Sequence, residues 1–455
     1  MTFDSINPAT GERIASYPVH TPEQVDAIVR EAQAAFEQWR GTTFAERAKL
    51  MKRLAAVLRE RQVADAQLMT REMGKPLEQA KGEIEKCAVC CDFYAEHAER
   101  FLAPEQVKTD AAKSYVAFEP LGIVLAVMPW NFPYWQVVRF AAPALMAGNA
   151  GLLKHAANVS GCALAIEQAV EQVGFPRGLF RALLIQSPRV AGVIEHPLVR
   201  AVTLTGSTPA GQSVAAKAGA VLKKTVLELG GSDPYIVLED ADLELAAQTC
   251  AASRMINGGQ SCIAAKRFIV VDSVKQRFEE LFVKFITAQQ MGPPEQVGVT
   301  VGPLARVDLR DSLHEQVERS VAAGARLLTG GQVPKGPGAY YPPTVLTDVK
   351  KGMAVYEEET FGPVAAIIPV KNEDEAVRIA NDSPFGLGAA VFTKDVARGE
   401  RIAAKRLEAG SCFVNANVRS DPRLPFGGIK GSGYGRELSS FGIREFVNIK
   451  TVYIK

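Results

Sequence analysis

The chain has 455 residues, of which 47% are hydrophobic and 22% charged, and its formal net charge is +2. This length is enough for two or three domains with substantial cores. Acidic and basic residues are interspersed, so the sequence lacks the basic stripe or charged tail that nucleic acids and anionic membranes attract. We therefore expect a globular protein with neither of these partners.

The seven cysteines follow no regular spacing, which indicates reduced thiols rather than a disulfide framework. Cys87, Cys90 and Cys91 lie in a segment of helical character without a second ligand pair, and this favours core packing over a zinc site. The polar N-terminus, 1–13, has no apolar signal-peptide core, and the longest apolar run, 121–130, is too short to span a bilayer. We expect a cytoplasmic protein that binds no metal.

The first part of the chain predicts helices. Segment 21–24, TPEQ, combines a Thr cap, a Pro in the first turn and a Gln three residues after the cap, which is typical of a helix start. Apolar residues then recur every three or four positions from Val25 to Trp39, and again from Leu50 to Leu58. We interpret both stripes as core-facing sides of helices.

From about residue 121 the pattern changes to short apolar runs that alternate with helical segments. The strand-like runs are 121–128, 201–205, 235–238 and 268–271, and the helical ones are 162–173, 243–256 and 274–286. A second series follows after about residue 232, with strand-like runs at 364–370, 389–392 and 412–415. This alternation predicts an α/β fold with parallel sheets covered on both faces.

A glycine-containing loop follows the strand that ends at Thr205. It reads Gly206-Ser207-Thr208-Pro209-Ala210-Gly211 and leads into a helix, the place where α/β sheets bind phosphate groups. The spacing is not G-x-G-x-x-G, and Gln212 stands where a P-loop needs Lys, so the usual dinucleotide motif and an NTPase are both disfavoured. Taken alone, a loop with this spacing is a plain turn more often than a ligand site.

Cys262 is the candidate nucleophile. It follows Gly258 and Gly259, in a segment where the backbone can pass close to a bound ligand. The alternative is a buried thiol that only fills space in the core. None of the five histidines offers an obvious base, whereas Glu228 lies between apolar residues before two glycines. Desolvation there would raise its pKa towards that of a general base, unless the side chain reaches solvent or pairs with a lysine.

Asn131 is the candidate oxyanion donor. It lies in the segment 129–133, PWNFP, where two prolines fix the loop after the first buried strand. An Asn amide together with the backbone N–H of the nucleophile makes a workable oxyanion hole. By itself the segment could also be a structural turn.

Taken together, these segments resemble the NAD(P)-dependent aldehyde dehydrogenase superfamily over nearly the whole length. The matching motifs occur in the family's order, and they are PWNFP at 129–133, Lys154, TGS at 205–207, LELGG at 227–231, GQSC at 259–262, EEETFGP at 357–363, PFG at 384–386 and PFGGIKGSGYGRE at 425–437. Within the superfamily, segments 135–149, 154–156 and 419–428 are most similar to bacterial succinate-semialdehyde dehydrogenases.

The resemblance implies roles for the catalytic residues. Cys262 would attack the aldehyde, Asn131 and the Cys262 backbone N–H would bind the oxyanion, and Glu228 would activate the water that hydrolyses the thioester. An acyl-CoA-forming enzyme is a rival, but Glu228 favours water as the acyl acceptor. A cysteine-dependent esterase, which needs no nicotinamide, is the alternative from another class.

The resemblance also implies the cofactor site. Its residues would be Trp130, Lys154, Ala157, Gly206, Ser207, Gly211, Leu229, Glu359 and Phe361. NAD-preferring members often carry a Glu at the position of Ala157, where its carboxylate binds the adenosine ribose. Without that charge, and with Lys154 present to attract a 2′-phosphate, we expect NADP, with NAD as a possible alternative.

Substrate contacts are expected at Trp135, Arg139 and Ser420. A helix starting near Pro133 would place Trp135 and Arg139 on one face, and Arg139 with Ser420 could bind a distal carboxylate. We therefore expect succinate semialdehyde to be oxidised to succinate. Glutarate semialdehyde, longer by one methylene, remains a competing substrate because such a difference changes binding by only about 1–3 kcal/mol.

The implied architecture has three parts. A Rossmann-like cofactor-binding domain covers 1–107 and 120–231, and an α/β catalytic domain covers 232–430. A small β oligomerisation element covers 108–119 and 431–455, where 447–454 is strand-like and could pair across subunits. We expect a homodimer or homotetramer.

Overall fold

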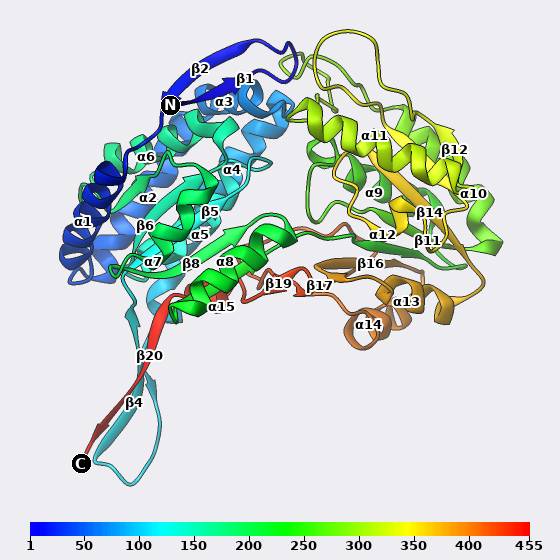
Figure 1. The fold of residues 1–455 in the computed structure, drawn as a ribbon. Coiled ribbons are helices and arrows are strands. Elements are labelled where there is room, and N and C mark those ends of the chain that lie inside the picture. Colours follow the sequence, from blue (N-terminus) through cyan, green and yellow to red (C-terminus); the bar gives the residue numbers. More distant parts are fainter.

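The computed structural model describes residues 1–455 and contains two large β-sheets, each flanked by helices, and a thin sheet that projects from the body (Figure 1). In Figure 1 the six-stranded sheet lies on the left and the seven-stranded sheet on the right. Strands within each sheet are mainly parallel. The predicted α/β class is therefore confirmed.

The six-stranded sheet has the strand order β19-β9-β8-β5-β6-β7. Its strands are β5 (Ile123–Met128), β6 (Ala150–His155), β7 (Phe180–Ala182), β8 (Val199–Thr205), β9 (Lys224–Glu228) and the antiparallel β19 (Gly433–Tyr434). The helices associated with it are α1 (Pro22–Trp39), α2 (Phe44–Glu60), α3 (Gln62–Met73), α4 (Leu77–Phe101), α5 (Trp135–Met146), α6 (Ser160–Val173), α7 (Val190–Glu195), α8 (Thr208–Ala220) and α15 (Ser439–Ile443). An N-terminal hairpin, β1 (Thr2–Ile6) and β2 (Arg13–Pro18), lies against α3 and α6.

The seven-stranded sheet has the strand order β12-β13-β14-β11-β10-β16-β17. Its strands are β10 (Pro234–Val237), β11 (Arg267–Val271), β12 (Arg326–Thr329), β13 (Thr344–Thr347), β14 (Val364–Val370), β16 (Gly388–Phe392) and β17 (Ser411–Val414). Its helices are α9 (Leu243–Met255), α10 (Asp272–Thr287), α11 (Val307–Ala322), α12 (Ala354–Glu357), α13 (Glu373–Asn381) and α14 (Val396–Lys405), and the short strands β15 (Phe385–Gly386) and β18 (Ile429–Lys430) pair separately.

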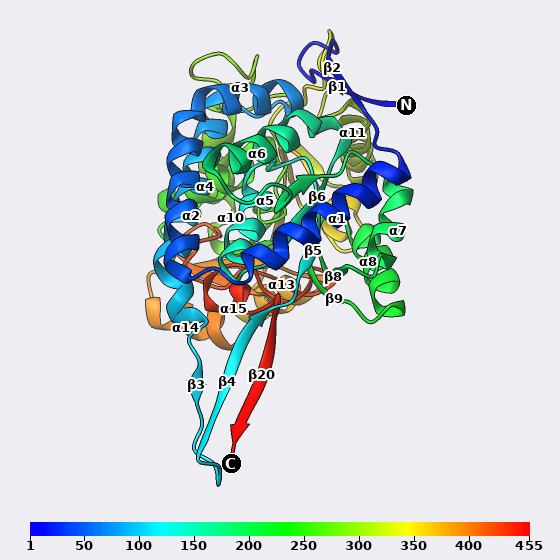
Figure 2. The same cartoon turned by 90° about the vertical axis from the view of Figure 1, so that its left-hand side faces the viewer.

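The third sheet forms a projecting arm. It consists of β3 (Glu105–Gln106), β4 (Lys113–Pro120) and β20 (Val447–Ile454), in the order β20-β4-β3. Figures 1 and 2 both show β4 and β20 extending away from the body, with the C-terminus near the tip. Ile449, Tyr453 and Ile454 on β20 are exposed. The predicted strand at 447–454 is confirmed, and it pairs with β4 over the whole length of both strands.

The strands of the second sheet explain the continuous apolar runs in the sequence. Along β10, Tyr235 and Val237 pack into one apolar cluster, whereas Ile236 packs into another. Side chains alternate between the faces of a strand, so both faces of this sheet are buried. The predicted start of α1 is also confirmed, because Thr21 and Gln24 form a capping box there.

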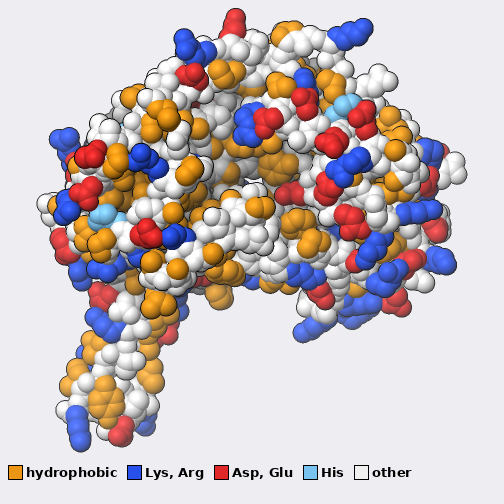
Figure 3. Space-filling view, viewed as in Figure 1, with side chains coloured by type: hydrophobic (Ala, Val, Ile, Leu, Met, Phe, Trp, Pro, Cys, Tyr) orange, Lys and Arg blue, Asp and Glu red, His pale blue; other side chains and the backbone are white.

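The surface of the body carries mixed charges. Figure 3 shows acidic and basic side chains interspersed over this face, and the face is hollowed where the halves that contain the two large sheets meet. None of the helices is both long enough and apolar enough to cross a membrane.

Candidate active site

The loop that carries Cys262 has an unusual backbone. Asn257, Gly258 and Gly259 all have positive φ, at 53°, 60° and 76°. A Cβ atom on Gly259 would lie 2.2 Å from the carbonyl oxygen of Gly362. Because only glycine can approach another backbone this closely, the loop packs tightly against the segment that carries Glu359 and Phe361.

Hydrogen bonds hold the loop after this turn. The buried Lys266 Nζ donates to the carbonyl oxygens of Ser261 at 2.9 Å and of Cys262 at 2.8 Å. The side-chain oxygen of Gln260 accepts from the backbone N–H of Ala305 at 2.9 Å. These bonds fix the backbone on both sides of the thiol.

Cys262 lies on the wall between two cavities. One, which we call the cofactor cavity, has a volume of about 260 Å³. It is lined by Pro129, Trp130, Asn131, Gln136, Thr205, Gly206, Ser207, Leu229, Gly230, Cys262, Leu309, Glu359 and Phe361. The other, which we call the substrate cavity, has a volume of about 110 Å³. A thiol at this position can reach a small molecule from either side.

The structure brings Asn131 to Cys262. Both residues line the cofactor cavity, and the amide orientation of Asn131 is set on two sides. Gln136 Nε2 donates to Asn131 Oδ1 at 3.0 Å, and Asn131 Nδ2 donates to the Gln260 carbonyl at 3.0 Å. An amide nitrogen carries two hydrogens, so Asn131 keeps a second one that can be donated to an oxyanion.

The thiol of Cys262 is neutral in this arrangement. Burial raises its pKa to about 12, although the nearby charges of Lys266 and Arg139 act in the opposite direction. A thiolate is the reactive nucleophile. Attack on a carbonyl therefore requires a base or a change in the electrostatics of the site.

Glu228 ends strand β9, as the motif suggested, but its carboxylate lines neither cavity. A Cβ atom on Gly427 would lie 2.6 Å from its Oε1, and neither carboxylate oxygen has a hydrogen-bond partner. Burial, together with the charge of Glu437, raises the pKa of Glu228 well above its usual value. The carboxyl group therefore holds a proton and must turn towards Cys262 to act there.

Arg139 lies in the cavity where a substrate contact was predicted. Together with Trp135 and Ser420 it lines the substrate cavity, so the predicted helix face is confirmed in α5. Its guanidinium, however, forms an ion pair with Glu437. It also lies 4.7 Å from the centroid of the Phe426 ring. The charge of Arg139 is thus already paired inside the protein.

The loop after β8 opens on the cofactor cavity. Gly206 and Ser207 line this cavity, and Ser207 is the N-cap of α8 without a side-chain cap bond. The first N–H groups of α8 are consequently free to bind an anion. Gly211 lies outside the cavity, where a Cβ atom would come within 2.5 Å of Leu229 Cδ2. Its role in the structure is close packing of α8 against Leu229.

Two residues from the segment after α12 line the other end of the cofactor cavity. Glu359 forms an ion pair with Lys266 at 3.3 Å and accepts from the Gly231 N–H at 3.1 Å. The ring of Phe361 meets Trp130 edge to face, with centroids 5.7 Å apart. This end therefore combines an aromatic wall with a carboxylate.

Lys154 and Ala157 lie at the end of β6. Lys154 is buried, has no carboxylate within ion-pair distance and has a pKa lowered by burial. Ala157 begins the short 3₁₀ helix Ala157–Val159, and the side-chain nitrogen of the neighbouring Asn158 is buried without a partner. The end of β6 therefore offers hydrogen-bond donors and a positive charge, and no carboxylate is paired with that charge.

Sequence reasoning missed several residues of the site. Glu437 is the last residue of the motif at 425–437, and no role was assigned to it individually. Its burial beside Arg139 could not be inferred from that motif. Lys86 lines the substrate cavity from α4. The sequence did contain a signal that Lys86 faces the interior. Lys86 lies three residues after Glu83 and four before Cys90, both of which are buried, and residues at these spacings share a helix face.

Comparisons with known proteins identify the family of the chain. The sequence profile of the aldehyde dehydrogenase family matches residues 1–452. A probable succinate-semialdehyde dehydrogenase (NADP+) of Synechocystis is 50% identical over 454 residues, covering 100% of both chains. A succinate semialdehyde dehydrogenase (NAD(P)+) of Escherichia coli is 49% identical over 449 residues, covering 99% of this chain and 97% of the relative. The crystal structure of succinic semialdehyde dehydrogenase from Streptococcus pyogenes in complex with NADP+ superimposes with a TM-score of 0.97 at 38% identity, covering 99% of each chain.

Proposed function

Because the chain belongs to the aldehyde dehydrogenase family, we propose that it oxidises succinate semialdehyde to succinate, with NADP as the hydride acceptor. The observation that carries this proposal is the position of Cys262 on the wall shared by a cofactor cavity and a small substrate cavity. The names of the relatives that are about 50% identical over their full length support the same substrate and cofactor.

The residues around the cofactor cavity fit a dinucleotide. The open N-terminus of α8, after Ser207, suits a pyrophosphate. Trp130 and Phe361, whose rings meet edge to face, form an apolar wall in the same cavity as Cys262 that suits a nicotinamide ring. Lys154 and Ala157, at the end of β6, line neither the cofactor cavity nor the substrate cavity. The buried Lys154, which has no ion-pair partner, nevertheless suits a 2′-phosphate, and Ala157 leaves no carboxylate at its position to repel it. When bound, the dinucleotide supplies the acceptor for the hydride that leaves the substrate carbon.

The protein's own groups carry the remaining steps. The Cys262 thiol releases its proton to solvent, and the thiolate sulfur attacks the carbonyl carbon to form a thiohemiacetal. Asn131 Nδ2 and the Cys262 backbone N–H donate to the oxygen that becomes negative. Preorganisation matters here, because Gln136 and Gln260 already hold the Asn131 amide in place. Oxidation of the same carbon leaves a thioester on the sulfur.

Glu228 then acts on water. Its buried carboxyl group is protonated, so it must first turn from Gly427 towards the thioester and lose this proton to solvent. The resulting carboxylate then takes a proton from the attacking water. Attack of the activated water breaks the carbon–sulfur bond, releases succinate and returns the thiol of Cys262. The proton taken by Glu228 passes to solvent.

The substrate cavity favours a short aldehyde. Its volume of about 110 Å³ lies well below the roughly 300–1,000 Å³ of pockets for drug-sized ligands. Trp135, Arg139 and Ser420 are its proposed substrate contacts. Glutarate semialdehyde remains the closest competitor.

The projecting arm supports a homo-oligomer. Strand β20 exposes Ile449, Tyr453 and Ile454 far from the body of the chain, and β20 lies at the edge of its sheet. An exposed apolar edge strand is typical of a surface that pairs with another subunit. We propose a dimer or tetramer in which this arm takes part.

A panel of substrates and cofactors tests the proposal. Formation of reduced nicotinamide is followed with succinate semialdehyde, glutarate semialdehyde and butanal, each with NADP and NAD. We expect the highest kcat/KM for succinate semialdehyde with NADP and no turnover by Cys262→Ala. Glu228→Gln should give a single burst of reduced nicotinamide followed by slow turnover. Ester hydrolysis without any nicotinamide reduction on this panel would favour the esterase alternative instead.

A further inference from the structure

Lys86 is a cation of the substrate cavity that has no acidic partner. Its Nζ donates to Ser420 Oγ at 2.7 Å and lies 4.1 Å from the centroid of the Trp135 ring. No carboxylate lies within ion-pair distance of it. Burial, helped by the charge of Arg139, lowers the pKa of Lys86 to about 8. A buried ammonium without a counter-ion gains stability when a carboxylate is brought next to it.

The acids that could neutralise Lys86 are already engaged. On the same helix, one oxygen of Glu83 pairs with Lys75, and the other accepts from the backbone N–H groups of Tyr134 and Trp135, both at 2.9 Å. Across the cavity, Glu437 pairs with Arg139. These pairings leave Lys86 without an acidic partner.

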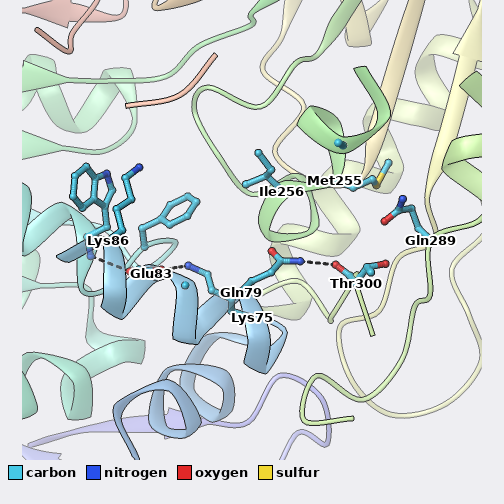
Figure 4. Close-up of a pocket in the computed structure, with 12 residues that line it drawn as sticks. Lys75, Gln79, Glu83, Lys86, Met255, Ile256, Gln289 and Thr300 are labelled. Atoms are coloured by element: carbon cyan, nitrogen blue, oxygen red, sulfur yellow. Dashed lines mark hydrogen bonds and ion pairs between the residues drawn. The ribbon is translucent and has the colours of Figure 1, made fainter. Parts of the chain in front are cut away.

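Lys86 stands where the substrate cavity meets the outside. A larger outer cavity of about 440 Å³ lies on the other side of it. The two cavities share Lys86, Phe132, Trp135 and Ile256 in their walls. Figure 4 shows Lys86 and Glu83 on the α4 wall of the outer cavity, with Met255 and Ile256 on the wall across from them. Lys86 is therefore one of the residues at the boundary between the outer cavity and the substrate cavity that contains Cys262.

We propose that Lys86, held by Ser420, binds the distal carboxylate of the aldehyde and selects substrates that carry one. This inference rests on the proposed function, since it names the group that recognises the proposed substrate. With the aldehyde carbon at Cys262, the carboxylate lies at the junction of the cavities and supplies the negative charge that Lys86 lacks. Arg139 then acts mainly through shape and polarity, because its own charge is balanced by Glu437.

Arg419 is the other cation on the wall of the substrate cavity. Its residue is exposed, whereas Lys86 is half-buried between the two cavities. Water screens an exposed charge, so its attraction for a carboxylate is much weaker than that of a charge at a buried junction. The structure therefore favours Lys86 as the main anion-binding group.

The test compares succinate semialdehyde with butanal, an aldehyde of equal chain length without the carboxylate. The readout is the ratio of the two kcat/KM values with NADP. A hydrogen-bonded charge pair is lost in Lys86→Met, so we expect the ratio to fall by at least about tenfold. Lys86→Gln, which can still donate to Ser420, should lose the preference as well, whereas Lys86→Arg should keep the ratio within about threefold of wild type.

Lys81→Met, on the same helix outside both cavities, is the matched control and should leave the ratio unchanged.

The outcomes separate this inference from the proposed function. If wild type prefers succinate semialdehyde and Lys86→Met and Lys86→Gln keep that preference, the assignment of Lys86 is wrong and the proposed function stands. If wild type shows no preference for succinate semialdehyde over butanal, both are wrong. Residual turnover of butanal by each variant shows that it has folded.

Discussion

Arg139 and Glu437 form an ion pair whose side chains are only 3% and 6% exposed. The pair joins two distant parts of the chain, helix α5 and the segment after β19. Arg139 also lines the substrate cavity, and the charges of both residues act on the Glu228 carboxyl group. The pair is therefore part of the buried interior and also changes the electrostatic environment of Glu228.

Removing one member of this pair should destabilise the protein strongly. In Glu437→Gln the Arg139 guanidinium stays buried without its counter-ion, and breaking a buried pair in this way costs about 3–5 kcal/mol. We expect a clear decrease in the melting temperature, measured by calorimetry or circular dichroism. Glu280→Gln, which breaks an exposed pair with Arg277, is the control and should change the melting temperature little. Similar melting temperatures for the two variants would contradict the stabilising role of the buried pair.

Asn131→Ala should lower the rate of the chemical steps. Loss of one oxyanion donor typically lowers kcat by about 10²–10³-fold. KM should change less, because the amide acts on charge that develops in the transition state. Gln136→Ala should have a smaller effect on kcat, because it removes only the bond that orients Asn131. Steady-state kinetics with succinate semialdehyde measure both variants, and a kcat for Asn131→Ala within tenfold of wild type would argue against the donor role.

The reactivity of Cys262 should depend steeply on pH. Its pKa is raised to about 12 by burial, so the thiolate is a minor species at neutral pH and becomes more abundant as the pH rises. In the cofactor-free enzyme, alkylation by iodoacetamide should speed up about tenfold per pH unit between pH 7 and 9. Mass spectrometry of the peptide that contains Cys262 gives the rate. A plateau within this range would show that the thiol ionises at lower pH than its burial implies.

The strands and the main catalytic motifs could be predicted because they depend on local pattern. Apolar runs buried on both faces mark β5, β8, β10, β11, β14 and β16. The end of β5 then locates Asn131, the two glycines after residue 229 mark the position of Glu228, and the glycines at 258–259 locate Cys262. The N-terminal hairpin β1–β2, strand β6 and strand β13 were missed, since these segments have weaker strand patterns and are held by tertiary contacts.

The remainder of the site depends on contacts between distant segments. Lys86 and Ser420 are 334 positions apart yet share a hydrogen bond. The conformation of Glu228 depends on Gly427 and Glu437, which approach it only after the chain returns from the second sheet. Motif spacing carries no information about such approaches, so sequence reasoning could not show that Glu228 lies against Gly427 or that Glu437 is the partner of Arg139.

The cofactor preference should respond to position 157. Ala157→Glu introduces a carboxylate at the end of β6, near the unpaired Lys154. That charge should repel a 2′-phosphate and accept hydrogen bonds from ribose hydroxyls, so we expect the ratio of kcat/KM for NADP to that for NAD to fall at least about tenfold. Ala157→Gln, of equal size without charge, should change the ratio less. An unchanged ratio in Ala157→Glu would place the 2′-phosphate elsewhere.

Gly259→Ala should damage the catalytic loop more than an ordinary glycine substitution. Any L residue at a left-handed φ costs about 1–2 kcal/mol. Gly298 has a φ of +87° and nothing lies within 4 Å of the position that a Cβ atom would take there, so Gly298→Ala should show only this loss, with normal kcat. At Gly259 the Cβ atom would also meet the Gly362 carbonyl oxygen at 2.2 Å, which forces the Cys262 loop away from the segment that carries Glu359. We expect a lower melting temperature than for Gly298→Ala and a decrease in kcat of at least about tenfold, since catalysis is sensitive to small displacements of the nucleophile. Equal behaviour of the two variants in both measurements would mean that the contact between Gly259 and Gly362 does not position Cys262.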